Sequence, residues 1–140
     1  MQNTDQQVVE GIVRGWLDAV SRGDREQIRA NHADDLLMYD FPYTVHGLTE
    51  YDRTWDFFFD NQRGPITFAP EHLASTVGDH VAFVHCDVHC DGTTAGSFRF
   101  RLTVGLEKRN GTWLITHEHH SVPTTDKTLI MPEKQDTLDA

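Results

Sequence analysis

Apolar residues in the first half of the chain recur every three or four positions, which is the spacing of an amphipathic helix. Thr4 and Gln7 stand before the first such stretch in the pattern of a capping box, and Gly23 follows it as a stop signal. Two shorter stretches follow, one after Asp24 and one after Thr49. The sequence therefore predicts three helices, over about residues 5–21, 24–32 and 49–63.

The second half of the chain changes to a period of two, which is typical of half-buried strands. Between two such runs stands Asn110-Gly111, a strong signal for a tight hairpin. The runs predict strands over 66–77, 80–91, 97–109 and 112–122, with a shorter strand over 36–40. Because helices come first and hairpin-connected strands follow, the expected fold class is α+β with a mainly antiparallel sheet.

The two-residue hairpin loop predicts the register of the last two strands, provided that the pairing continues without interruption. The expected cross-strand pairs at the far end are His117 with Val104 and His119 with Leu102. Both histidines then share the buried face, while Glu118 and His120 point to solvent or to a partner subunit. On this register His117 and His119 are either buried core histidines or two polar groups at the deep end of an apolar pocket.

A second group of histidines raises the question of a metal site. His85, Asp87 and His89 alternate along one predicted strand and face away from its uniformly apolar side. Histidines that alternate along a strand are weak evidence for a metal site without a complete ligand set. The sequence therefore predicts no metal and no other cofactor, and metal-dependent chemistry is kept as a further alternative.

The chain of 140 residues carries a formal charge of −10. A surface this acidic repels phosphate backbones, so nucleic acid is not an expected partner. The sequence has no apolar run long enough to span a membrane, and its N-terminus lacks the pattern of a secretory signal. Cys86 and Cys90 lie about 13 Å apart on one predicted strand, too far for a disulfide between them. These features favour a reducing compartment and a cytoplasmic location.

Two longer motifs carry a resemblance to a known family. The last predicted strand lies in GTWLITHEHHSVP, and the short strand in the first half lies in HADDLLMYD. With the order of helices and strands, these residues resemble the NTF2-like superfamily, and in particular its SnoaL-like and ketosteroid-isomerase-like domains. The resemblance covers about residues 5–123, so we expect a domain over 1–123 and a C-terminal tail over 124–140.

The resemblance implies a cone, in which three N-terminal helices pack on a strongly curved, mainly antiparallel sheet and enclose an apolar pocket. Domains of this kind commonly dimerise through the outer sheet face, so a homodimer and a small apolar ligand are the expected partners. The faces of the predicted elements place these residues around the pocket: Trp16, Tyr39, Tyr43, Tyr51, Trp55, Phe58, Phe59, Phe100, Leu102, Val104 and Trp113.

The resemblance also implies a catalytic base. Ketosteroid isomerases place an aspartate at the end of the strand that follows an Asp-Asp pair, and Asp40 stands at that place. A carboxylate in an apolar pocket can move a proton next to a carbonyl group. The alternative is an aspartate that merely ends a strand before Phe41-Pro42.

Two departures from the isomerase pattern concern the groups that stabilise the developing oxyanion. Trp16 stands where the isomerases carry a tyrosine on the first helix, and the stretch 103–105 offers no carboxylic acid. We therefore expect His117 or His119 to act as hydrogen-bond donor or general acid beside Asp40.

Two functions from different classes remain open. The first is an enzyme that isomerises, dehydrates, cyclises or hydrolyses a small apolar carbonyl compound by acid–base chemistry. The sequence contains no nucleophile elbow, phosphate loop or nucleotide fingerprint, which leaves chemistry without a cofactor. The alternative is a non-catalytic module of the same fold that binds a small molecule or dimerises, because a fold alone does not determine function.

Overall fold

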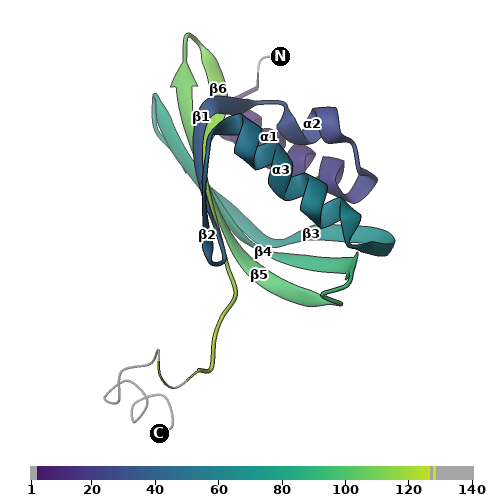
Figure 1. Cartoon of the computed structure of the whole chain (residues 1–140). Coiled ribbons are helices and arrows are strands. Elements are labelled where there is room, and N and C mark those ends of the chain that lie inside the picture. The colour runs from purple at the N-terminus through teal and green to yellow at the C-terminus, as the bar shows by residue number, and fades with distance from the viewer. Residues whose placement is uncertain (1–2, 127, 129–140) are drawn as a thin grey trace, which may run out of the picture.

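The computed structural model describes residues 3–126 and 128. In this part of the chain, helices α1 (Asp5–Arg22), α2 (Arg25–Arg29) and α3 (Gly47–Asp60) lie on one face of a curved sheet (Figure 1). The α+β class is therefore confirmed. Most of the expected C-terminal tail, residues 127 and 129–140, lies outside the described residues, so the division into a domain over 1–123 and a tail over 124–140 stays a prediction.

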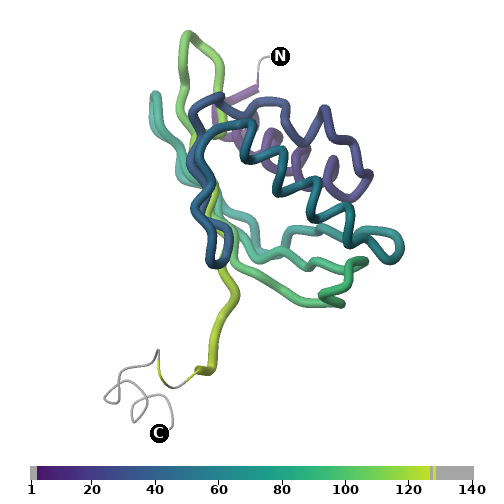
Figure 2. Tube along the Cα trace, viewed as in Figure 1, coloured from purple at the N-terminus to yellow at the C-terminus, as the bar shows by residue number. Residues whose placement is uncertain are grey.

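The sheet has six strands in the order β2-β1-β6-β5-β4-β3. They are β1 (His32–Asp40), β2 (Tyr43–His46), β3 (Gln62–Val77), β4 (Val81–Thr93), β5 (Phe98–Arg109) and β6 (Thr112–Ser121). Neighbours pair antiparallel, except that β1 and β6 run parallel (Figures 1 and 2). The parallel pair brings the ends of two distant strands together, with Asp40 beside His120. The apolar pattern does not predict β2, which is too short for its period to show.

Local sequence explains where α1 begins and ends. The Thr4 hydroxyl accepts a hydrogen bond from the Gln7 backbone N–H, and the Gln7 side chain accepts one from the Thr4 backbone N–H, so the predicted capping box is confirmed. Gly23 ends the helix with a φ of 68°, a left-handed conformation that glycine adopts without a steric penalty. The buried side of the helix includes Trp16, whose ring packs edge-on against the rings of His32 and His120 on the sheet.

A β-bulge in β6 changes the register that the hairpin predicts. The expected pairing holds from the hairpin as far as Leu106 with Ile115, but Gly105 then pairs with His117, and Thr116 is the extra residue. Gly105 permits this arrangement, because a Cβ atom at that position would lie only 3.3 Å from the His117 Cβ.

The bulge turns every following side chain of β6 to the opposite face of the sheet. Glu118 and His120 are buried, whereas His117 is half-buried and His119 is exposed on the outer face. The prediction that His117 and His119 face the core and that Glu118 and His120 face outward is therefore wrong. The physical reason is that side chains alternate with a period of two, so one inserted residue reverses the whole set.

The hydrophobic core lies between α1, α3 and the inner face of the sheet. Cys86 and Cys90 are both buried on β4 and unbonded, as their spacing predicts, and burial raises the pKa of each thiol to about 11. Thiols with such a pKa are poor nucleophiles at neutral pH. Among the described residues, none of the helices combines the length and the apolar character that crossing a bilayer requires.

Candidate functional site

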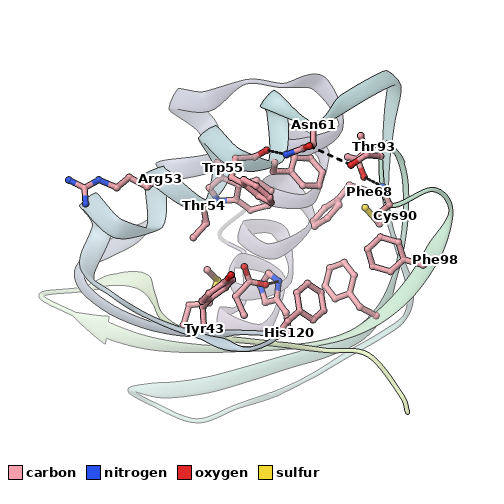
Figure 3. Close-up of a pocket in the computed structure, with 18 residues that line it drawn as sticks. Tyr43, Arg53, Thr54, Trp55, Asn61, Phe68, Cys90, Thr93, Phe98 and His120 are labelled. Carbon is pink, nitrogen blue, oxygen red and sulfur yellow. Dashed lines mark hydrogen bonds and ion pairs between the residues drawn. The ribbon is translucent and has the colours of Figure 1, made fainter. Parts of the chain in front are cut away.

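A cavity of about 530 Å³ lies between α3 and the inner face of the sheet. Thr54 and Trp55 come from α3 and Asn61 directly follows its last residue, while Tyr43, His120 and Phe98 come from the sheet opposite (Figure 3). Most of the wall is apolar and aromatic, formed by Met38, Phe41, Tyr43, Trp55, Phe57, Phe58, Phe68, Phe98 and Phe100. A few polar groups in an aromatic cavity of this size are typical of small-molecule sites.

Two titratable groups face each other in this cavity. Asp40 ends β1 and His120 lies beside it on β6, and the distance between Asp40 Oδ1 and His120 Nδ1 is 3.8 Å. The imidazole stacks on Phe100 with an interplanar angle of 14° and a centroid distance of 5.2 Å. Burial raises the pKa of Asp40, and the nearby His120 offsets part of this rise. The pair therefore holds groups suited to proton transfer against an apolar wall.

A buried carboxylate lies directly behind this pair. Glu118 Oε1 accepts a hydrogen bond of 2.8 Å from His120 Nε2, and Glu118 Oε2 lies 2.6 Å from both His32 Nε2 and the Tyr51 hydroxyl. Burial alone would raise the pKa of Glu118, but the hydrogen bonds from His120 and His32 lower it to about 2. Glu118 is therefore ionised at neutral pH, although no part of its side chain reaches solvent.

The partners of Glu118 are held by elements on both sides of the core. His32 opens β1 and its Nδ1 lies 3.1 Å from the Ala30 carbonyl oxygen. Tyr51 comes from α3. The pKa of its hydroxyl is raised well above the ordinary value, mainly by burial and in second place by the negative charge of Glu118. The phenol therefore stays protonated and donates to the carboxylate.

Two indoles pack around these groups. Trp16 meets the rings of His32 and His120 edge-on, with centroid distances of 6.1 and 6.2 Å, and it contacts Trp55 in the same manner at 6.2 Å. The N–H groups of Trp16 and Trp55 are buried without a hydrogen-bond acceptor among the described residues. Trp16 lies behind the cavity wall, so it does not stand in the position of an oxyanion donor that contacts a ligand.

Of the three residues predicted to be catalytic, Asp40 alone lines the cavity. His117 lies on the outer face, where its Nδ1 is 2.8 Å from the Leu37 carbonyl oxygen. His119 lies on the same face, and both imidazoles pack edge-on against Tyr39. The expectation that they act beside Asp40 is wrong, because the bulge at Thr116 points them away from the core.

The predicted pocket residues divide into three groups. Four of them line the cavity, namely Tyr43, Trp55, Phe58 and Phe100. Five are buried core residues outside its wall, namely Trp16, Tyr51, Leu102, Val104 and Trp113. The last two are placed elsewhere: Tyr39 is 40% exposed on the outer face, and Phe59 packs against Trp55 and the Arg25 guanidinium. Helical periodicity identifies buried positions, but it does not separate cavity walls from solid core.

The sequence reasoning missed the most important polar residues of the site. Glu118, His32 and His120 form the buried network together with Tyr51, whereas the sequence predicts Glu118 and His120 on the outer face and His32 at the end of a helix. One available signal was Gly105, since a glycine within a strand often marks a bulge.

The outer sheet face carries the other histidines. His85 is exposed, while Asp87 and His89 are half-buried, so all three face away from the core as predicted. His89 Nε2 lies 2.9 Å from the hydroxyl of Ser97, the residue directly before β5. Within residues 3–126 and 128, three or more side chains able to hold a metal ion do not gather at any one place.

Comparison with known proteins places this fold in a family. The sequence profile of the SnoaL-like domain matches residues 9–125. The chain belongs to the SnoaL-like domain family. A search of curated proteins finds no match to the chain.

Solved structures agree with this assignment. An NTF2-like protein of unknown function from Pseudomonas putida KT2440 is 25% identical, with a TM-score of 0.82 over 91% of this chain and 93% of that one. A ketosteroid isomerase-like protein from Erwinia carotovora atroseptica SCRI1043 is 17% identical, with a TM-score of 0.71 over 88% of this chain and 100% of that one. A protein with a cystatin-like fold from Caulobacter vibrioides is 14% identical, with a TM-score of 0.75 over 94% and 96%. The two more distant structures support the fold alone.

Proposed function

We propose that this SnoaL-like protein is a cofactor-independent acid–base enzyme that acts on a small apolar carbonyl compound. The observation that carries the proposal is the pair of Asp40 and His120, whose side chains approach within 3.8 Å at the wall of an aromatic cavity. The gap is too long for a direct hydrogen bond, yet both atoms can reach one ligand atom at about 3 Å from each. His120 replaces the two histidines that the predicted register favoured.

The two groups divide the chemistry between them. In the state where Asp40 is ionised and His120 carries a proton on Nδ1 as well as the one on Nε2 that Glu118 holds, Asp40 removes a proton from the carbon next to the carbonyl group. His120 then donates its Nδ1 proton to the carbonyl oxygen, which gives an enol. In a compound with a β,γ double bond, Asp40 returns its proton to the γ carbon, the enol O–H returns its proton to His120, and the compound is isomerised. In a β-hydroxy compound, the hydroxyl group takes the proton from Asp40 and leaves as water, while the enol O–H returns its proton to His120.

The remaining wall orients the ligand and keeps water away. Aromatic side chains on opposite sides of the cavity, such as Phe58 and Phe100, favour a flat, largely apolar molecule. Exclusion of water strengthens the interaction of the ligand with the charged pair. Arg53 points away from the other labelled side chains in Figure 3, so we assign it no role in the reaction.

Hydrogen–deuterium exchange tests this proposal without knowledge of the natural substrate. The protein is incubated in D₂O with apolar cyclic ketones such as 2-tetralone, and exchange at the carbon next to the carbonyl is followed by NMR. We expect exchange faster than in protein-free buffer, and a loss of about 10²–10⁴-fold in Asp40→Asn and in His120→Gln. His119→Gln is the matched control, because His119 lies one residue away but faces outward. Equal exchange in Asp40→Asn and the wild type would refute the proposal.

A second candidate is a binding module without turnover. It is favoured by the non-acidic indole of Trp16, which stands behind the cavity where the isomerase resemblance expects a phenol. In that case an apolar ligand raises the melting temperature of the wild type and of Asp40→Asn by the same amount, and neither protein accelerates exchange.

A further inference from the structure

We infer that Glu118 is a positioning residue, which holds the hydrogen of neutral His120 on Nε2 so that the Nδ1 lone pair faces Asp40 and the cavity. We also infer that His32 is a buried imidazolium, which balances the negative charge of Glu118. The importance of this arrangement for proton transfer rests on the function proposed above, whereas the protonation pattern itself can be tested without any substrate.

The first step of the argument is the bond between Glu118 and His120. An ionised carboxylate can only accept, so the hydrogen between Glu118 Oε1 and His120 Nε2, 2.8 Å apart, belongs to the imidazole. A neutral imidazole has a hydrogen on only one of its two nitrogens, so Nδ1 is left as an acceptor. The hydrogen bond that His120 donates to Glu118 also restricts rotation of the ring, and Phe100 stacks on its face. The atom that exchanges protons with the cavity is therefore Nδ1.

The second step concerns the charge of Glu118. An isolated carboxylate with no exposure would be strongly disfavoured, and a buried ion pair is tolerated when further hydrogen bonds satisfy it. Glu118 accepts three such bonds, one from each of His120, His32 and Tyr51. Its low pKa agrees with this environment.

The third step concerns His32. Its Nε2 faces the carboxylate of Glu118 at 2.6 Å, and its Nδ1 faces the Ala30 carbonyl oxygen at 3.1 Å. Both partners are pure acceptors, so each ring nitrogen holds a hydrogen and the ring carries a positive charge. The buried pair of His32 and Glu118 is then neutral as a whole. The Nδ1 atom of His120 faces Asp40 Oδ1 at 3.8 Å.

This arrangement resembles the general logic of an oriented histidine, in which a buried carboxylate fixes one ring nitrogen and thereby determines the protonation of the other. Here the reactive nitrogen faces a second carboxylate, that of Asp40, rather than a nucleophilic hydroxyl. The charged or titratable groups that face His120 are Glu118 on β6 and Asp40 on β1, and those that face His32 are Glu118 and Tyr51 on α3.

Long-range ¹H–¹⁵N NMR on the full chain tests the inference directly. Near neutral pH we expect His32 to show two protonated nitrogens, and neutral His120 to show hydrogen on Nε2 with a free Nδ1. His120→Gln and a His32→Gln variant assign the signals. A neutral His120 with its hydrogen on Nδ1, or a His32 ring with one protonated nitrogen, would overturn the inference.

Two substitutions of Glu118 test separately the two parts of the inference, the charge of His32 and the position of the hydrogen on His120. In Glu118→Gln we expect His32 to lose one hydrogen, because the charge that it balances is gone and the new amide can donate to its Nε2. In Glu118→Ala we expect the hydrogen of neutral His120 to distribute between both nitrogens, because Nε2 has lost its acceptor. If Glu118→Ala does not fold, the wild-type spectrum still decides the question. His119→Gln serves as the control and leaves both rings unchanged.

The outcomes are distinguishable from those of the exchange assay. Absence of ketone exchange together with the expected spectrum would refute the proposed enzyme and leave the protonation pattern in place. If exchange does occur, Glu118→Gln should shift its pH profile, whereas a purely structural role of Glu118 would lower the amount of folded protein and leave the profile unchanged.

Discussion

The Tyr51 hydroxyl provides a clean test of the buried network, because Tyr51→Phe removes one oxygen and leaves the ring in place. The hydroxyl donates a 2.6 Å hydrogen bond to ionised Glu118, and Tyr51 is 0% exposed. A hydrogen bond to a charged group contributes about 1.5–3 kcal/mol to folding. The variant still leaves Glu118 with donors from His32 and His120, so we expect a loss toward the lower end, about 2 kcal/mol.

Urea unfolding at pH 7, followed by tryptophan fluorescence, measures this loss. With an m-value of about 1–3 kcal/mol/M, a loss of about 2 kcal/mol lowers the urea midpoint by about 1 M. Tyr43→Phe is the matched control, since Tyr43 is 69% exposed and its change should stay within about 0.5 kcal/mol. Equal midpoints for the two variants, with unchanged m-values, would show that the Tyr51 hydroxyl does not stabilise Glu118 and that the network is wrongly described.

The other predictions concern four individual residues. The pKa of Glu118 is lowered from 4.5 to about 2 on folding. The ionised side chain therefore contributes about 3 kcal/mol to the free energy of unfolding above pH 4.5, and this contribution is lost as the pH falls toward 2. When the free energy of unfolding is measured against pH, this acid-dependent loss should be absent in Glu118→Gln. Gly105→Val places methyl groups against the His117 Cβ and should lower stability by about 1–3 kcal/mol, whereas Gly15→Ala, in open space on α1, should raise it by about 0.5–1 kcal/mol, both measured by urea unfolding. The homodimer expected from the family resemblance would cover the outer sheet face, where Phe83 is 45% exposed; Phe83→Asp should then turn a dimer into a monomer in light scattering, and a wild-type monomer would contradict that expectation.

The extent to which the sequence predicts this structure can be judged from particular elements. The capping box at Thr4 and the hairpin at Asn110-Gly111 are local signals, and both lie where they were predicted. The apolar faces of β4 and β5 were also predicted correctly, because each strand keeps its alternation throughout. Asp40 was placed in the cavity by the resemblance to ketosteroid isomerases rather than by its own local pattern.

The members of the proposed acid–base pair, Asp40 and His120, could not be obtained from local patterns. The partner of Asp40 is His120 rather than His117 or His119, because the bulge at Thr116 reverses the alternation of β6. The bulge depends on the close approach of Gly105 to a residue twelve positions later, and a period counted along one strand does not include that contact. For the same reason the period along β6 predicts that Glu118, between two histidines, is an ordinary surface charge.

The amino-acid sequence by itself determined the helices, most strands and the α+β class, since these depend on periodicity, caps and turn residues within short stretches. The family followed from the resemblance of two longer motifs, GTWLITHEHHSVP and HADDLLMYD, to a known family. The tertiary structure decided which side chains meet. The parallel pairing of β1 with β6 brings Asp40 to His120, and the packing of α3 brings Tyr51 to Glu118. Such contacts join residues 67–86 positions apart in the chain. They therefore form only when the strands have paired in their native register and packed against the core.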